Sequence, residues 1–251
     1  PSIRKKMWEL MASRANGTDA LIAVSDWFAT EMKQKMHLRE GLVHTIPIGI
    51  QTNQYRIHEP SLHNRTIGYL SRLCDENGLG ILVDAFLLLK KESGFDDVRL
   101  RLTGGKTHDD HSFIRRQVKK IREAGLSEMV EFHDNFGMPA LQDFFAGLTV
   151  LSVPVLKGEA FGMYQLEAMA SGIPVVQPAL GAFPEIVGKT GGGLIYQPNT
   201  PEALSKAIAC LLNDPAKLLT MSKVGRNGVE EHFDAPLVST KLMTLYQQLT
   251  H

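Results

Sequence analysis

Short apolar runs alternate with longer stretches of helical periodicity through most of the chain. The runs are rich in valine, isoleucine and leucine and are bounded by turn-forming residues, which is typical of β-strands. Because several runs are apolar on both faces, the pattern predicts a parallel sheet with helices on both sides.

The alternation is most regular from about residue 65 to residue 213. The expected strands are TIGYLS, VRLRLTG, MVEFHD, LTVLSVP, IPVVQP and GLIYQ, and the expected helices cover 79–92, 111–124, 139–146, 163–171 and 201–213. Within GAFPEIVGKTGGGLIYQP, residues 181–198, the part that precedes the strand GLIYQ is expected to form a loop, in which Glu185 is either a polar contact or an acidic residue at the start of a helix. The sequence therefore predicts an α/β fold with a Rossmann-like, doubly wound parallel sheet, whose ligands lie beyond the carboxyl ends of the strands.

The segments on either side of this domain are mainly helical. Ile3 to Arg14 is expected to be a helix, and a second helix follows Ser25, its expected N-cap. The first helix carries basic residues and a tryptophan, so it either packs on its own protein or lies on a membrane surface. The polar stretch 57–65 is expected to be a connector, and residues 215–250 to be helical.

The composition narrows the function classes. The 27 basic and 27 acidic residues balance, which argues against a nucleic-acid-binding protein. No apolar run approaches the ~20 residues of a membrane-spanning helix, and the amino terminus lacks the apolar stretch of a secretory signal. Because the two cysteines are far apart and form no metal-ligand spacing, the sequence predicts a cytoplasmic protein with reduced thiols.

A first candidate site is the stretch GYLSRLCDENGLG, residues 68–80, which leaves an expected strand through a glycine-containing loop and enters a helix. Such loops face the ligand crevice of a doubly wound sheet, where helix amino termini attract anions. Arg72 can donate two hydrogen bonds to a phosphate. The alternative is a surface charge paired with Asp75 or Glu76, and the loop chemistry alone does not separate the two.

The stretch LTGGKTHDD, residues 102–110, has a Gly-Gly turn directly after an expected strand. Its spacing is not that of the dinucleotide-binding fingerprint, so the turn either lets the backbone pass close to a ligand or is simply tight. The four polar residues His108 to His111 suggest a metal site. Adjacent residues point in different directions, however, so exposure to solvent is expected, and no metal cofactor.

The stretch KGEAFGMYQLEAMASGIPVV, residues 157–176, follows an apolar strand and continues as a helix. The amides of Gly162, Met163 and Tyr164 would then lie at a helix amino terminus and could hold a diphosphate. Glu159 precedes them and Glu167 follows inside the helix, and carboxylates accept the paired hydroxyls of sugars well. Singly, Glu159 could be a capping residue and Glu167 a structural one, but the combination favours a phosphorylated, hydroxyl-rich ligand.

These stretches closely resemble a known family. GEAFGMYQLEAMASGIPVV, followed by GAFPEIV and GGLIYQP, is similar to the C-terminal half of the family-4 retaining glycosyltransferases, and the likeness extends from about Ala20 to the last helix. The resemblance implies a two-domain GT-B enzyme whose C-terminal, Rossmann-like domain holds a nucleotide-sugar. On that basis residues 1–43 are expected to be the end of an N-terminal acceptor domain, 44–64 a connector, 65–232 the donor-binding domain and 233–251 a C-terminal helix.

At the sugar end, the resemblance implies that Glu159 contacts the donor sugar near its anomeric centre. Phe161 and Gly162 would form the tight loop around the sugar, and Glu167 would bind the ribose hydroxyls. The backbone from His133 to Phe136 would edge the base.

At the phosphate end, the resemblance implies that Arg72 and the amides of residues 162–164 hold the diphosphate. The family commonly has a lysine at the position of Asn77, and more often an asparagine at that of Ile48. The chain therefore has one cation fewer, which is expected to weaken the neutralisation of a leaving diphosphate.

The implied function is the transfer of a hexosyl group from a nucleotide-diphosphate sugar to an acceptor hydroxyl, with retention and without a metal. Glu159 and Arg72 would act in catalysis, and the chain would be inactive without the N-terminal domain. The implied partners are the nucleotide-sugar donor, an acceptor whose chemistry the sequence leaves open and, in the membrane-surface alternative, a lipid surface. Two other functions remain: a non-catalytic nucleotide-sugar-binding module, favoured by Asn77, and a GT-B-type nucleotide-sugar epimerase, against which the glutamate pair argues.

Overall fold

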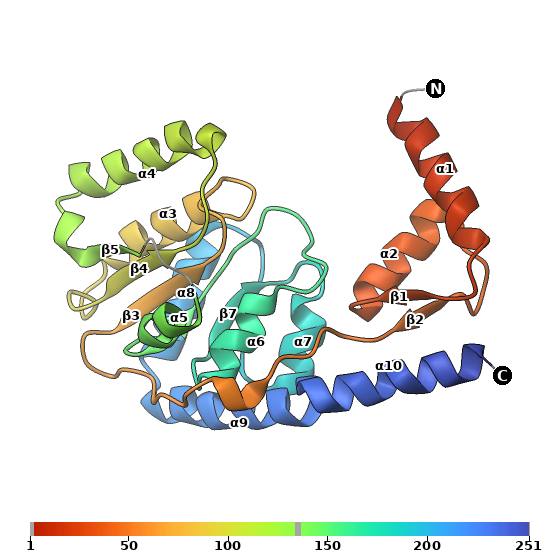
Figure 1. Cartoon of the computed structure of the whole chain (residues 1–251). Coiled ribbons are helices and arrows are strands. Elements are labelled where there is room, and N and C mark those ends of the chain that lie inside the picture. Colours follow the sequence, from red (N-terminus) through yellow and green to blue (C-terminus); the bar gives the residue numbers. More distant parts are fainter. Residues whose placement is uncertain (1–2, 134–136, 251) are drawn as a thin grey trace.

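The computed structural model describes residues 3–133 and 137–250 and arranges them around two parallel sheets (Figure 1). The larger sheet has six strands in the order β5-β4-β3-β6-β7-β8, and the smaller sheet pairs β1 with β2. Helices cover both faces of the larger sheet, which confirms the predicted α/β, Rossmann-like, doubly wound fold (Figure 1).

A small N-terminal unit, residues 3–45, lies beside the larger sheet (Figure 1). Its elements are α1 (Ile3–Asn16), β1 (Leu21–Ala23), α2 (Asp26–Met36) and β2 (Val43–Thr45). Because β2 pairs with β1, the expected boundary after residue 43 falls inside a strand. The Ser25 side chain accepts a hydrogen bond from the Phe28 N–H, as expected of a helix cap.

Helix α1 contacts α2 but contains no buried residue. Its apolar side chains Ile3, Met7, Leu10 and Met11 are all exposed. The described residues therefore leave the apolar side of α1 uncovered. None of the described helices is long and apolar enough to cross a membrane.

The strands of the larger sheet are β3 (Thr66–Leu70), β4 (Arg99–Thr103), β5 (Val130–His133), β6 (Val150–Leu151), β7 (Val175–Pro178) and β8 (Gly193–Tyr196). Helices α3 (Leu79–Leu89), α4 (His111–Glu123) and α8 (Pro201–Leu212) lie toward one face, and α5 (Met138–Phe145), α6 (Met163–Ala170) and α7 (Phe183–Thr190) toward the other (Figure 1). Right-handed crossovers explain this distribution, because the chain first moves from β3 out to β5 and then back past β3 to β6. Three short 3₁₀ turns are η1 (Thr52–Gln54), η2 (His108–Asp110) and η3 (Ser127–Met129).

Two elements differ from the sequence prediction. Residues 181–198 are not one loop, because α7 forms within them, with Pro184 in its first turn. Of the two alternatives for Glu185, the acidic residue in the first turn of a helix is therefore confirmed. Strand β6 is shorter than the apolar run predicts. Just beyond it, the Val153 N–H donates to the side chain of Gln177 in the neighbouring strand β7 at 3.0 Å, so a side chain of β7 replaces a backbone acceptor and the ladder ends.

The core lies on both faces of the central strands. Every residue of β3, β6 and β7 is buried, as central strands of a parallel sheet require. The largest fully buried side chains come from the sheet and from helices of both layers; they include Tyr69, Phe86, Phe144 and Phe183. Packing on both faces fixes the positions of the strands. It therefore also fixes where the loops that follow the strands lie, along one edge of the sheet.

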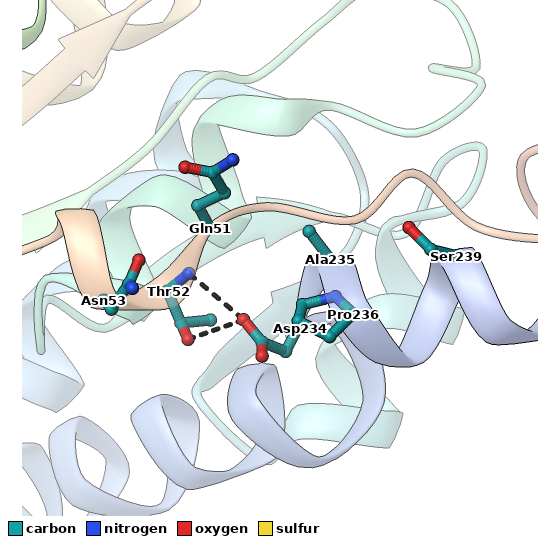
Figure 2. A pocket seen from close by; sticks show the side chains of 7 residues that line it. All are labelled: Gln51, Thr52, Asn53, Asp234, Ala235, Pro236 and Ser239. Atoms are coloured by element: carbon teal, nitrogen blue, oxygen red, sulfur yellow. Dashed lines mark hydrogen bonds between the residues drawn. The ribbon is translucent and has the colours of Figure 1, made fainter.

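The chain passes from the N-terminal unit to β3 across the junction of α9 (Pro215–Phe233) and α10 (Ala235–Leu249). Ile50 forms an isolated bridge with Asp234, whose carboxylate accepts hydrogen bonds from the Thr52 N–H at 3.2 Å and hydroxyl at 2.7 Å (Figure 2). A cavity of about 490 Å³ lies here, lined by Gln51, Thr52, Asn53, Asp234, Ala235, Pro236 and Ser239 (Figure 2). Beyond the junction, α10 runs under the N-terminal unit (Figure 1), and its Val238 and Leu245 pack with Ile46.

The crossing depends on Gly49, because a Cβ at this residue would lie 2.8 Å from the Ala235 Cα and 3.1 Å from the Val238 Cβ. We expect Gly49→Ala to lower the free energy of unfolding by about 1–3 kcal/mol, since the backbone of α10 must shift. Urea denaturation followed by circular dichroism measures the change.

The matched control is Gly188→Ala in α7, where an added Cβ would meet no atom within 4 Å. This change is expected to raise the free energy of unfolding by up to about 1 kcal/mol through helix propensity. Equal effects of the two substitutions would contradict the tight crossing.

Candidate functional site

The loops after β3 and β6 leave the sheet next to each other, because β3 and β6 are neighbouring strands. The strand order reverses between them, since the chain runs from β3 to β4 and β5 and then returns to β6. In open parallel sheets a ligand crevice forms at such a switch point. We call residues 71–78, after β3, the Arg72 loop, and residues 152–162, after β6, the Glu159 loop.

The two loops contact each other through their backbones. The Leu156 N–H donates a hydrogen bond to the Glu76 carbonyl at 3.0 Å. Gly78 comes so close to the other loop that a Cβ there would lie 1.8 Å from the Pro154 carbonyl oxygen. The structure therefore brings the two predicted site loops together at one edge of the sheet.

The amino terminus of α6 presents uncapped backbone amides. Gly162 begins the helix in the left-handed conformation, with φ 77°, which favours glycine. No described side chain caps the helix, so the N–H groups of Met163 and Tyr164 are left for another acceptor. Gln165 instead turns back and donates to the Phe161 carbonyl at 2.6 Å. With the partial positive charge of the helix terminus, these amides are suited to bind a phosphate.

Glu159 lies just before this helix terminus and is half-buried. Its Oε1 accepts a hydrogen bond from the Ala160 N–H at 3.0 Å. Burial, and then the nearby negative charge of Glu159, raise the pKa of the Tyr164 hydroxyl well above its usual value. Among the described residues that buried hydroxyl has no hydrogen-bond partner. A carboxylate and a polar group without a partner thus lie together at the start of α6.

Arg72 pairs with Asp110, from the loop after β4, rather than with Asp75 or Glu76. Its Nε and Nη2 donate to the two carboxylate oxygens of Asp110, each at 2.9 Å. Nη2 also donates to the Thr107 Oγ1 at 3.0 Å. The Arg72 side chain is still 47% exposed, whereas that of Asp110 is only 6% exposed. The ion pair therefore sets the direction of the guanidinium without burying it.

The sequence prediction missed Asp110 as the partner that holds Arg72. Thr107 and Asp110 form a capping box, in which the Asp110 Oδ2 accepts hydrogen bonds from the Thr107 N–H at 2.7 Å and hydroxyl at 2.8 Å. The hydrogen bonds from Arg72 first, and then those from Thr107, lower the pKa of Asp110 far below its usual range. The spacing of a threonine three residues before an acid was the available signal. The expected exposure of His108 to His111 is therefore wrong for Asp110.

The other acidic and histidine residues of that run do not gather into a centre. His108 and Asp109 are fully exposed, with 3.9 Å between the His108 Nδ1 and an Asp109 oxygen. No group of three or more histidines, cysteines, aspartates or glutamates in residues 3–133 and 137–250 could hold a metal ion.

Two further predicted residues bond to neighbouring protein groups. The Asn77 Nδ2 donates to the Ser71 Oγ at 2.8 Å and so braces the Arg72 loop. The Glu167 Oε1 accepts a hydrogen bond from the Tyr55 hydroxyl at 3.1 Å. Burial raises the pKa of Glu167, and the Tyr55 hydrogen bond opposes that shift. No feature of the sequence around Tyr55 indicated this contact across 112 residues.

A cavity of about 240 Å³ lies between the Arg72 loop and the end of β5. It is lined by Leu73, Lys106, Ile114, Val118, Phe132 and His133. The predicted base-binding backbone, His133 to Phe136, begins at this cavity. Phe136 itself lies outside the described residues.

Comparison with known proteins matches residues 64–214 to a family model described as glycosyl transferases group 1. MMP alpha-(1->4)-mannosyltransferase of Mycolicibacterium hassiacum is 27% identical over 246 residues, which are 96% of this chain and 56% of that protein. D-inositol 3-phosphate glycosyltransferase of Corynebacterium glutamicum is 26% identical over 192 residues, 74% of this chain and 44% of that protein. The chain spans about half the length of the curated relatives it matches.

Solved structures share the fold. Sucrose-phosphate synthase from Thermosynechococcus elongatus matches with a TM-score of 0.84 and 24% identity, over 98% of this chain and 62% of that chain. The Anabaena protein HepE, in complex with UDP and glucose, matches with a TM-score of 0.85 and 22% identity, over 97% of this chain and 67% of that chain. At these identities the likeness shows the fold alone.

The Asp110 network predicts a defined pH dependence of stability. We expect Asp110→Asn to lower the free energy of unfolding at pH 7 by about 1–3 kcal/mol, because a buried acceptor of charged hydrogen bonds is lost. The folded protein holds the Asp110 pKa low, so the unfolded chain takes up the proton first as the pH falls. The difference in the free energy of unfolding between wild type and variant should therefore shrink as the pH falls from about 5 to 3, as urea titrations measure.

Asp109→Asn is the control for this experiment, since the side chain of Asp109 is 95% exposed. We expect it to change stability by less than about 0.5 kcal/mol at any of these pH values. An Asp110→Asn effect that stays constant down to pH 3 would contradict the charged network.

Proposed function

The chain belongs to the group 1 glycosyl transferases, and we propose that it binds a nucleotide-diphosphate sugar as the donor-binding part of a glycosyltransferase. The observation that carries the proposal is the placement of the Arg72 guanidinium and the uncapped terminus of α6 on two touching loops at the switch point. One is a fixed cation and the other a set of backbone donors, which together suit a diphosphate.

In this proposal the Arg72 guanidinium and the amides of Met163 and Tyr164 hold the diphosphate and take up the charge that develops as it leaves. The ion pair with Asp110 orients Arg72 before the donor arrives, so less side-chain freedom is lost on binding. Asn77 is uncharged, so Arg72 must neutralise more of the negative charge of the diphosphate.

The sugar of the donor would lie against Glu159, which precedes the phosphate-binding amides, and the ribose against Glu167. The nucleobase would enter the cavity at the end of β5, whose lining is mostly apolar. One relative is named as a mannosyltransferase, and one structural neighbour was solved in complex with UDP and glucose, which supports a nucleoside-diphosphate hexose as the donor class. We propose that the acceptor hydroxyl attacks on the face from which the diphosphate leaves, with retention, while Glu159 positions the sugar. The bond to the acceptor oxygen forms as the bond to the diphosphate breaks, and the hydroxyl proton passes to the departing phosphate oxygen.

A second candidate function is a nucleotide-sugar-binding module without turnover. It is favoured by Asn77, whose amide bonds within its own loop at a position where the resembling family commonly has a lysine. An assay of nucleotide diphosphate released from a nucleotide-sugar by the protein separates the two. Release in the presence of an acceptor supports the enzyme, and binding without release supports the module.

Titration calorimetry tests donor binding directly, with UDP, GDP and ADP and their glucose and mannose derivatives. We expect one of the three nucleotide series to bind. Arg72→Ala should weaken the binding of the nucleoside diphosphate of that series by about 10–100-fold, since a charged hydrogen bond contributes about 1.5–3 kcal/mol.

Arg122→Ala is the control, because this arginine is exposed in the last turn of α4. We expect it to change affinity by less than about twofold, as a surface change away from the site should. If Arg72→Ala binds as tightly as the control, the assignment of Arg72 is wrong.

Metal independence is tested by repeating the titrations in EDTA. Because Arg72 and backbone amides supply the positive charge for the diphosphate in this proposal, the affinity should change by less than about twofold. A loss in EDTA that added Mg²⁺ restores would show that a metal ion supplies that charge.

A further inference from the structure

The Glu159 loop is held by a helix that lies far away in the sequence. The Ser25 hydroxyl, at the amino terminus of α2, donates a hydrogen bond to the Ala160 carbonyl at 2.7 Å. The Ser25 Oγ also accepts a hydrogen bond from the Phe28 N–H at 3.1 Å. Ser25 therefore caps α2 and ties it to the loop, across 135 residues of sequence.

A second side chain that accepts hydrogen bonds from the start of α2 is Glu185, in the larger domain. The Glu185 Oε2, in the first turn of α7, accepts hydrogen bonds from the Asp26 N–H at 2.9 Å and the Trp27 N–H at 3.3 Å. Lys189 closes this contact, with its Nζ 3.0 Å from Glu185 and 3.7 Å from Asp26. The first-turn N–H groups of α2 thus find side-chain acceptors that also link the N-terminal unit to the larger domain.

The loop also packs closely against Trp27 and against the backbone that precedes α7. Trp27 lies over Gly158, where an added Cβ would come within 2.5 Å of two carbons of the indole ring. Gly181 also contacts the loop: it has φ +59°, and a Cβ there would lie 2.3 Å from the Glu159 backbone nitrogen and oxygen. The Ala182 N–H also donates to the Glu159 carbonyl at 2.9 Å. The Glu159 loop is therefore held by contacts with both α2 and the start of α7.

Ala160 links α2 to the Glu159 side chain. The Ala160 N–H donates to the Glu159 carboxylate, and the Ala160 carbonyl accepts from Ser25. A displacement of α2 would move Ala160 and with it the group that fixes the carboxylate. By contrast, the recorded partners of Arg72 come from the loop after β4 and not from α2.

We propose that the amino terminus of α2 is a positioning element for Glu159, with Ser25 as the contact that transmits the placement of the N-terminal unit to the donor sugar. The inference rests on the proposed function, in which Glu159 faces the sugar. Recognition of the sugar depends on this contact, whereas binding of the diphosphate does not.

The test compares Ser25→Ala with Asp214→Ala. Asp214 also caps a helix, α9, by accepting from the Lys217 N–H at 2.9 Å, and its hydrogen bonds among the described residues go to Leu211, Lys217 and Leu218 rather than to the Glu159 loop. Hydrogen exchange is measured on the ligand-free chain. We expect Ser25→Ala to speed exchange of the Glu159 loop amides by about tenfold, and Asp214→Ala to leave them unchanged. Glu185→Ala should act in the same direction as Ser25→Ala, because it removes the second acceptor for α2.

The second readout is binding of two ligand pairs, UDP with UDP-glucose and GDP with GDP-mannose. For the pair that binds, Ser25→Ala should weaken the nucleotide-sugar by about fivefold or more and the free diphosphate by less than about twofold. Unchanged exchange in the Glu159 loop, or equal loss for both members of the pair, would overturn the positioning role. Failure of the wild-type chain to bind either pair would instead contradict the proposed function, while the exchange measurement still tests the contact itself.

Discussion

The reversal of strand order between β3 and β6 is the constraint on which the site depends. All six strands of the larger sheet run parallel, so every loop that follows a strand leaves at the same edge. Helices depart to opposite faces on the two sides of the switch point, so the Arg72 loop and the Glu159 loop lie next to each other where a ligand of such a sheet is expected. The backbone hydrogen bond between Leu156 and Glu76 then holds the loops together. The chemistry follows from what these loops carry: a guanidinium, helix-terminal amides and a carboxylate.

Arg72, Glu167 and the Glu159 loop are each held by a side chain from another part of the chain. Arg72 is oriented by Asp110, Glu167 accepts from Tyr55, and the Glu159 loop is tied to Ser25. Such contacts reduce the freedom that a flexible loop would lose on binding a ligand. They also mean that the β4 loop, the crossing segment and the N-terminal unit all contact residues of the predicted site. The site is therefore a property of the whole described chain rather than of one motif.

The sequence predicted the layers well because hydrophobic periodicity reports burial, and burial decides which segments become strands and helices. It also placed Arg72 and Glu159 at the same edge, since parallel strands leave no other choice. It did not predict the end of β6, where the Gln177 side chain replaces a backbone acceptor of β7, and it gave a helix at Glu185 only as one of two alternatives, although Pro184 marks the first turn of α7.

The supporting contacts could not be predicted for a different physical reason. Asp110 and Arg72 are 38 residues apart, and Ser25 and Ala160 are 135 residues apart. A hydrogen bond between such residues exists only after the loops have adopted their final conformations. The local pattern gives the residue types but not the direction of their side chains. The capping-box spacing of Thr107 and Asp110 is the exception, because both members lie in one turn.

The central claim is that a nucleotide diphosphate binds at the amino terminus of α6, and backbone amide NMR during titration of the chain with UDP or GDP tests it most directly. The account predicts that the largest shift changes fall on the amides of Gly162, Met163 and Tyr164, with the Arg72 Nε–H changing in parallel. It would be contradicted if these signals stayed in place while the changes gathered at the cavity of the α9–α10 junction, around Thr52 and Asp234 (Figure 2).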